Sequence, residues 1–151
     1  MEYKNIAVNR KAYHEYEILD KIEAGISLLG SEVKSAREGK VNIKDSYVDL
    51  KSGEAILINA HISPYTNASH INHDPLRNRK LLLHKQELRK FEKKIKTRGF
   101  TVIPLRMYFT SKGLIKIEIA LAKGKHFYDK KRQLKERDMK RDMAREMKNF
   151  K

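Results

Sequence analysis

The sequence has no cysteine and no tryptophan, and its 151 residues include only three prolines and seven glycines. Without cysteine the chain can form neither a disulfide framework nor a thiolate zinc site, so nothing in it argues for an oxidising compartment. The chain also lacks an apolar run as long as a signal-peptide core or a membrane span. We therefore expect a cytoplasmic protein that does not insert into a membrane.

Positive charge, by contrast, is abundant. The chain holds 34 Lys and Arg residues against 19 Asp and Glu residues, a formal net charge of +15. Residues 123–151 contain 12 basic and 5 acidic residues, an excess of +7, and residues 1–122 contain 22 and 14, an excess of +8. This distribution predicts a body, 1–122, followed by a more strongly basic tail, 123–151. It also predicts a polyanionic partner, either nucleic acid or an anionic membrane surface.

The apolar pattern of the body is mainly that of β-strands. Residues 16–29 alternate between apolar and polar with a slip near residue 20, which predicts either one long bent strand or two strands joined by a bulge. Two pairs of segments rich in β-forming residues, each pair joined by a glycine-containing turn, predict two hairpins: 46–50 with 54–60, and 100–109 with 114–121. Pro104 predicts that its strand is an edge strand or carries a bulge.

Two helices are expected. One spans 31–39, with Ser31 as N-cap and a glycine at its end, and the other spans 85–98, where Leu88, Phe91 and Ile95 share one face. The long segment 61–79 predicts a loop. About six strands with two helices favour a small, partly or fully closed barrel of the oligonucleotide-binding type, with an open α+β sheet as the alternative.

The tail contains no glycine or proline after residue 124, so it can form a helix. Spacing by four places three methionines in one row and three arginines on the opposite side: Met139, Met143 and Met147 against Arg137, Arg141 and Arg145. One narrow methionine row cannot hold a helix on the body, so we expect a tail that is disordered or helical depending on its partner. A membrane-surface helix needs a broader apolar face, which favours RNA. The simpler alternative is a solvated charged helix that aids solubility.

Catalytic patterns are weak. His70 and His73 lie beside Asp74, but without cysteine or a regular element to fix them they are more typical of a polar loop with a turn. A row of carboxylates is explained by a solvated strand face: Glu15, Glu17, Asp20 and Glu23. The chain has no phosphate-binding glycine loop and no nucleophile elbow. We expect no enzyme activity, no metal and no cofactor.

Basic side chains cluster at several places along the body. They are Lys34 and Arg37 on the first predicted helix, Arg77, Arg79 and Lys80 after the long loop, and Lys123 and Lys125 before the tail. As phosphate contacts they would position an RNA without specifying its sequence. Any one of them taken alone is an ordinary surface charge.

Nine short stretches, in order along the chain, carry a resemblance to a known family: 9–12, 23–25, 30–35, 39–42, 45–48, 61–65, 74–77, 79–83 and 122–125. Through them the sequence closely resembles the small protein B family, the bacterial partners of transfer-messenger RNA. The resemblance implies an oligonucleotide-binding barrel with peripheral helices and a role in rescuing stalled ribosomes by trans-translation. The body would bind the tRNA-like domain of the RNA, and elongation factor Tu would join through the RNA. The tail would enter the vacant mRNA path at the decoding centre of the small subunit.

The resemblance also implies roles for single residues. Glu23, Leu82 and Lys116 match family positions needed for RNA binding, and Lys123 and Lys125 match a basic run beside them. The tail positions that match are Tyr128, Asp129, Lys130, Lys131, Arg132, Met147 and Lys148. Lys131 stands where the family has arginine, so either Lys131 or Arg132 would make that contact.

Two further hypotheses stay open at this point. One is a general basic RNA-binding or ribosome-associated structural protein. The other is a metal-dependent nuclease that uses His70, His73 and Asp74.

Overall fold

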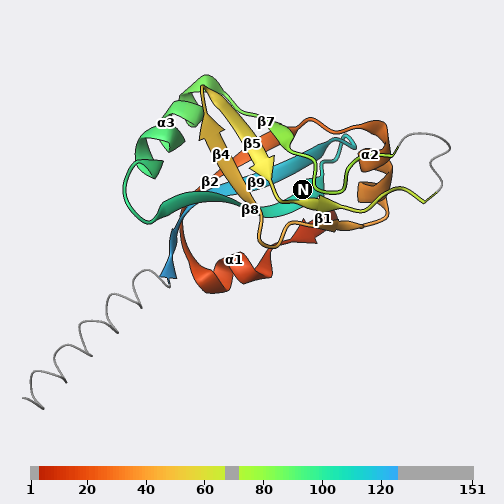
Figure 1. Cartoon of the computed structure of the whole chain (residues 1–151), viewed down its shortest axis with the longest axis horizontal. Helices are drawn as coiled ribbons and strands as arrows, with labels where there is room; N and C mark the ends of the chain where they lie inside the picture. The colour runs from red at the N-terminus through yellow and green to blue at the C-terminus, as the bar shows by residue number, and fades with distance from the viewer. Residues whose placement is uncertain (1–3, 67–71, 126–151) are drawn as a thin grey trace, which may run out of the picture.

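The computed structural model describes residues 4–66 and 72–125 (Figure 1). Within these ranges the chain forms nine strands and three helices. In chain order they are β1 (Lys4–Val8), α1 (Arg10–Glu15), β2 (Tyr16–Ile26), α2 (Gly30–Arg37), β3 (Val41–Asn42), β4 (Tyr47–Lys51), β5 (Glu54–Ile58), β6 (His61–Ile62), β7 (Arg79–Leu82), α3 (Lys85–Ile95), β8 (Phe100–Phe109) and β9 (Ile115–Gly124). None of the helices described is long and apolar enough to cross a membrane.

Six of the strands pair into a closed ring. The order of pairing is β8-β4-β5-β7-β2-β9, and β9 pairs back with β8, all antiparallel. Strand β1 adds to the outside of the ring by pairing with β8, and β3 and β6 form a separate two-stranded sheet. The mainly β architecture predicted from the sequence is confirmed, and the ring of pairings rules out the open sheet.

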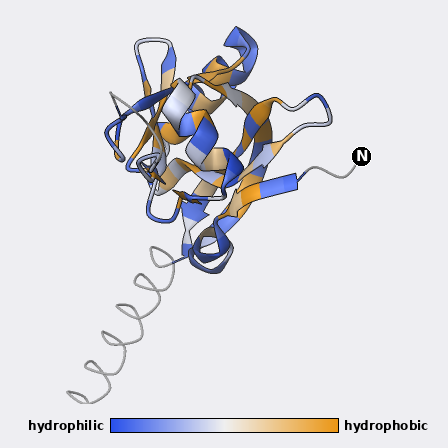
Figure 2. Ribbon diagram, turned by 90° about the vertical axis from the view of Figure 1, so that its right-hand side faces the viewer, coloured by the Kyte–Doolittle hydropathy of each residue, from blue (hydrophilic) through white to orange (hydrophobic). Residues whose placement is uncertain are grey.

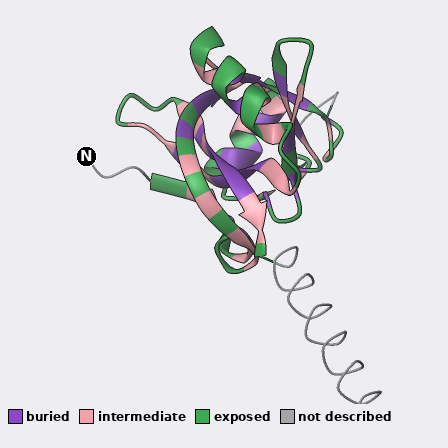
Figure 3. Ribbon diagram, turned by 90° about the vertical axis from the view of Figure 1, so that its left-hand side faces the viewer, coloured by how far each residue is buried: buried purple, intermediate pink, exposed green. Residues whose placement is uncertain are grey.

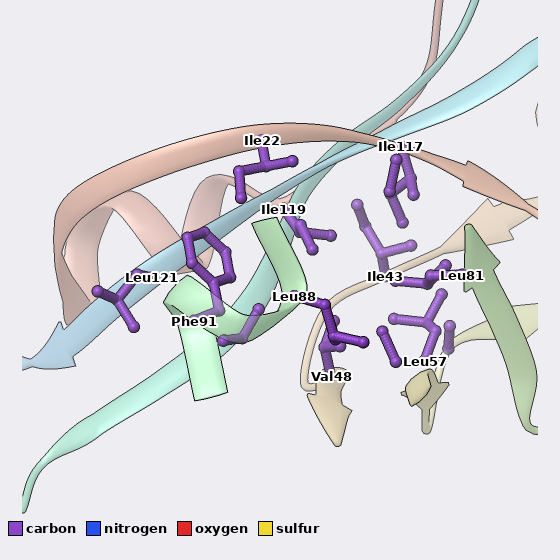
Figure 4. Close-up of a cluster of buried hydrophobic side chains, with 14 of the residues drawn as sticks. Ile22, Ile43, Val48, Leu57, Leu81, Leu88, Phe91, Ile117, Ile119 and Leu121 are labelled. Carbon is purple, nitrogen blue, oxygen red and sulfur yellow. The ribbon is translucent and has the colours of Figure 1, made fainter. Parts of the chain in front are cut away.

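The inner face of the ring holds the hydrophobic core. Ile22, Ile117 and Ile119 point inward from β2 and β9, and Leu88 and Phe91 from α3 pack onto them (Figure 4). Each large apolar side chain buried in this way contributes about 1.5–3 kcal/mol. Burial alternates along much of β2, whereas the central parts of β8 and β9 are buried almost continuously. Figure 3 shows buried, intermediate and exposed segments on the strands, and the hydrophobic residues concentrate on the strands in Figure 2. Helix α3 therefore covers one opening of the ring with its apolar face.

Two bulges bend the long strands. The register of β2 against β9 shifts between Ile18 and Asp20, and that of β8 against β9 shifts between Pro104 and Arg106. In both places a bulge was one of two alternatives predicted from the sequence. At the second one Leu105 and Arg106 both face outward, because a bulge interrupts the alternation of side chains. Pro104 lies within a strand that pairs on both sides, so the edge-strand alternative is wrong.

Helix α1 was not predicted from the sequence. It forms because Asn9 ties it to the ring: the Asn9 Oδ1 accepts a hydrogen bond from the Ala12 amide (3.2 Å), and its Nδ2 donates one to the Pro104 carbonyl (2.9 Å). Asn9 is buried, so these bonds also fix α1 against β8. Strands β1, β3, β6 and β7 were missed as well, being too short or too polar to show a period, and β6 lies in the segment predicted as a loop.

The first predicted helix is confirmed, but its cap is not Ser31. Helix α2 begins at Gly30, and the Glu32 carboxylate accepts a hydrogen bond from the Leu29 amide (2.8 Å). The Ser31 Oγ lies instead 2.8 Å from the His73 Nδ1. The predicted body, 1–122, ends two residues too early, because strand β9 continues to Gly124.

Candidate RNA interface on the outer face of the ring

The outer face of strands β2, β9 and β8 has two unlike ends. At one end α1 covers it, and a second apolar cluster is buried there: Ala12, Ile103, Leu105, Ala120 and Ala122. At the other end the register places polar and apolar side chains on a face where Glu23 and Leu82 are exposed. This second end is the candidate interface, and we call it the open face.

The open face is built from two rows of residues across the strands. In the first row Arg106 pairs with Glu118 and Glu118 pairs with Glu23. In the second row the strands bring together Tyr108, Lys116, Gly25 and Leu82. Because residues in register share a face of the sheet, Glu23, Leu82 and Lys116 lie close together although they are far apart in the sequence.

Leucine side chains make part of the open face apolar. Leu82 is 57% exposed and Leu114 is 55% exposed, and both line a hollow of about 380 Å³ with Lys116 at its edge. Gly25 forms the floor, where an added Cβ would lie 3.2 Å from the Leu82 Cβ. The glycine thus lets Leu82 lie across β2. An exposed apolar surface beside a lysine suits an unstacked nucleobase with its phosphate.

The polar part of the open face is held by hydrogen bonds and ion pairs. The Tyr108 hydroxyl donates a hydrogen bond to the Glu23 Oε2. Burial, and then the neighbouring Glu23 carboxylate, raise the pKa of Tyr108, so the phenol stays protonated and continues to donate. The Arg106 guanidinium lies 4.3 Å from the centre of the Tyr108 ring, and its Nε is 3.7 Å from the Glu118 Oε1.

Three other predicted cations lie on the surface away from these rows. Lys34 and Arg37 are exposed on α2, where the Lys34 Nζ is 5.5 Å from the centre of the Tyr65 ring. Lys80 is half-exposed, with its Nζ 3.4 Å from the Glu54 Oε1, also half-exposed. A pair in that environment is weak, so Lys80 can still contact a phosphate.

The predicted cations Lys123 and Lys125 lie at the other end of β9 from Lys116. Seven residues of strand separate Lys116 from Lys123, about 23 Å. The Lys123 Nζ is 5.4 Å from the centre of the Phe100 ring, and the Lys125 Nζ donates to the Tyr13 carbonyl (3.3 Å). The resemblance places these lysines beside the other RNA contacts, but in space they lie at the far end of β9, with Lys123 against Phe100 of β8 and Lys125 against α1.

The structure corrects the prediction for Arg79, which is fully buried. Its Nε donates to the Glu32 Oε2 (2.5 Å) and its Nη1 to the Ala60 carbonyl (2.7 Å). Because the guanidinium is buried and paired, Arg79 is not a phosphate contact in this structure. Arg77 also donates to Glu32, from its Nη2 to the Oε1 (2.6 Å), and keeps 32% of its side chain exposed.

His73, the residue on which the nuclease hypothesis rests, is buried. Its Nε2 is 2.8 Å from the Ile62 carbonyl, which requires a donor, and its Nδ1 lies 2.8 Å from the Ser31 Oγ. Both ring nitrogens are therefore engaged, which leaves neither for a metal. Residues 4–66 and 72–125 contain no group of three or more histidine, aspartate or glutamate side chains placed to hold a metal ion. His70 lies outside the described residues.

The predicted tail residues also lie outside the described residues: Tyr128, Asp129, Lys130, Lys131, Arg132, Met147 and Lys148. Of the open face, sequence reasoning missed Arg106, Tyr108 and Glu118. A polar residue at 106 within the apolar run 102–109 was the available signal. That signal could not be interpreted without knowing where the bulge in β8 changes which side chains face outward.

A small closed β ring with a basic surface, carrying an exposed leucine, a lysine and a fixed carboxylate on one face, defines the class of small β-barrel RNA-binding proteins. Comparison with known proteins identifies the family. A family model described as SmpB protein matches residues 6–149. The chain belongs to the SmpB family.

Relatives in this family are similar over nearly their whole length. The SsrA-binding protein of Nostoc punctiforme is 56% identical over 150 residues, covering 98% of this chain and 96% of the relative. The SsrA-binding protein of Symbiobacterium thermophilum is 52% identical over 144 residues, covering 95% and 91%. A solved structure described as "tmRNA-SmpB: a journey to the center of the bacterial ribosome" aligns with a TM-score of 0.67 at 49% identity, covering 79% of this chain and 83% of that one.

Proposed function

We propose that this protein binds the tRNA-like domain of transfer-messenger RNA, the SsrA RNA, and takes part in trans-translation on stalled bacterial ribosomes. Membership of the SmpB family supports this function, as do the relatives described as SsrA-binding proteins. The description of the structural neighbour joins the same RNA with the bacterial ribosome. The role is one of binding, contains no catalytic step, and belongs in the cytoplasm, where ribosomes work.

The observation that carries the proposal is the grouping of Glu23, Leu82 and Lys116 on the open face. In this role Leu82 would pack on a base and Lys116 would contact a phosphate, while Glu23 would accept hydrogen bonds from base or ribose groups. Lys123 and Lys125, with Lys34, Arg37, Arg77 and Lys80, would add sequence-independent attraction.

Salt titration separates this function from general RNA binding. Affinity for the tRNA-like domain and for an unrelated tRNA is measured between low and physiological salt. The proposal requires tighter binding to the tRNA-like domain at every salt concentration, because contacts to bases do not depend on counterion release. Equal affinities with equal salt slopes would instead indicate the general basic RNA-binding protein.

The basic tail would carry the ribosomal part of the function, with Tyr128 to Arg132 and Met147 and Lys148 as its contacts. Elongation factor Tu would join through the bound RNA. Deleting residues 129–151 should leave affinity for the tRNA-like domain within about twofold and abolish tagging on stalled ribosomes. A truncation that weakened RNA binding as strongly as Glu23→Gln would contradict the division into body and tail.

A further inference from the structure

Tyr108 is an outward-facing residue of the ring that is nevertheless almost completely buried, at 1% exposure. Its position pairs with Lys116 on β9, and Lys116 pairs in turn with Gly25 on β2. Strands two apart are separated by about 10 Å. Tyr108 therefore extends across β9 to reach Glu23 on β2, and the length of a tyrosine side chain is needed to do so.

The aromatic ring of Tyr108 is held in place by Arg106. The Arg106 guanidinium lies over it at 4.3 Å, in the geometry of a cation–π contact. Arg106 is held in turn by two partners: its Nε is 3.7 Å from the Glu118 Oε1, and its Nη1 donates to the Asn5 Oδ1 (3.2 Å). A chain of contacts thus runs from β1 through Arg106 and Tyr108 to Glu23, an exposed carboxylate.

The charges of this cluster cancel. Glu23 and Glu118 balance Arg106 and Lys116, whereas the whole chain carries +15. Attraction to RNA phosphates must then come mainly from cations elsewhere, and a carboxylate at this place repels phosphate. The chemistry left to Glu23 is to accept hydrogen bonds from base N–H groups or the ribose 2′-hydroxyl, which requires a defined direction.

We propose that Tyr108 is a positioning residue for RNA selectivity: its hydroxyl fixes the Glu23 carboxylate so that the remaining acceptor sites of Glu23 face the base or ribose groups of the bound RNA. This inference rests on the proposed function. A carboxylate has about four acceptor sites, so one bond from Tyr108 leaves capacity for the RNA. Fixing the side chain in advance removes the entropy loss that ordering a glutamate would add to binding.

The test is a double-mutant cycle on the full chain with Tyr108→Phe, Glu23→Gln and the double variant. Phenylalanine keeps the ring under Arg106 and removes only the hydroxyl. Affinity is measured for the tRNA-like domain and for an unrelated tRNA, with circular dichroism to verify that each variant is folded. Tyr47→Phe, an exposed tyrosine on β4, is the matched control for loss of a hydroxyl.

We expect Tyr108→Phe to weaken binding to the tRNA-like domain about 3- to 10-fold, the size of one hydrogen bond, with an unchanged salt slope. Binding to the unrelated tRNA should stay within about twofold. Glu23→Gln should weaken binding about 10-fold, and the double variant should match it, because Tyr108 acts through Glu23. Tyr47→Phe should bind like the native protein.

Four outcomes overturn the inference. Native affinity in Tyr108→Phe, with the native protein still selective, removes the role of Tyr108 and leaves the proposed function intact. Additive losses in the double variant, or equal losses for both RNAs, mean that Tyr108 acts only on the fold. A native protein that does not distinguish the two RNAs overturns the proposed function as well.

Discussion

Two glutamates of this protein, Glu23 and Glu32, both accept hydrogen bonds from other side chains, yet they have opposite surroundings. Glu32 is fully buried between Arg77 and Arg79, and the Arg79 guanidinium is buried with it. Glu23 is exposed on the open face and held on one side by Tyr108. Both oxygens of the buried Glu32 carboxylate accept hydrogen bonds from groups of the protein itself. The exposed Glu23 carboxylate can still accept hydrogen bonds from a ligand. Burial and hydrogen-bond partners, rather than residue type, decide which acid is structural.

The largest effect is expected from the buried group. Glu32→Gln leaves Arg79 buried without a counter-charge, which should lower the free energy of unfolding by about 3–5 kcal/mol. Thermal unfolding should show a melting temperature lower by about 10 °C or more. Glu38→Gln on the same segment removes an exposed pair with Lys40 (3.1 Å) and should change stability by less than about 0.5 kcal/mol. Equal effects of the two substitutions would contradict a structural role for Glu32.

Acidic pH should remove the stabilisation that the Glu32 carboxylate gives to the fold. Burial raises the pKa of Glu32, but hydrogen bonds from Arg77, the Leu29 amide and Arg79 outweigh it and hold the pKa below its ordinary value of 4.5. The unfolded chain therefore binds a proton at a higher pH than the folded one. The stabilisation is complete above about pH 4.5 and is lost as the pH falls through the folded pKa.

Urea unfolding of the native protein and Glu32→Gln between pH 7 and pH 3 measures this contribution. The difference in stability between the two proteins should shrink below pH 4.5. The pKa values of Asp20 and Asp45 are also lowered, by Lys90 and Lys11, but both acids are present in both proteins and cancel in the difference. A difference that stays constant down to pH 3 would contradict the pH linkage.

A smaller effect is expected at Lys116, on the open face near Glu23. Lys116→Gln should weaken binding to every RNA by a similar factor and reduce the salt slope by about 1, because it removes one phosphate contact. Lys112→Gln, an exposed lysine in the turn between β8 and β9, is the control and should leave both quantities near native values. A loss of selectivity without a change of slope would assign Lys116 to base recognition instead.

Most of the fold could be predicted from the sequence, because apolar residues recur at regular spacing in the long strands and in α3. The bulge near residue 19, the one at Pro104 and the hairpin at residues 51–53 all have local causes. Helix α1 could not be predicted, since it depends on Asn9 bonding to a carbonyl 95 residues away. Single turns of helix with no apolar period have no signal of their own in the sequence.

Within the candidate site, local sequence could not separate the two glutamates or the two kinds of arginine. Arg77 and Arg79 follow a polar loop and look like RNA contacts, but Glu32, 45 and 47 residues earlier, pairs with both. Tyr108 likewise meets Glu23 only after 85 residues of intervening chain. Such pairings are set by strand order and register, which appear only when the ring closes.

The most direct test of the contrast is to measure two quantities on the same two variants, Glu23→Gln and Glu32→Gln. These are the free energy of unfolding and the affinity for the tRNA-like domain, the latter at a low temperature where both variants are folded. Glu23→Gln should bind about 10-fold more weakly with stability within about 0.5 kcal/mol of native. Glu32→Gln should lose about 3–5 kcal/mol of stability while its affinity stays within about twofold. Stability and affinity that fall together in both variants would contradict the account.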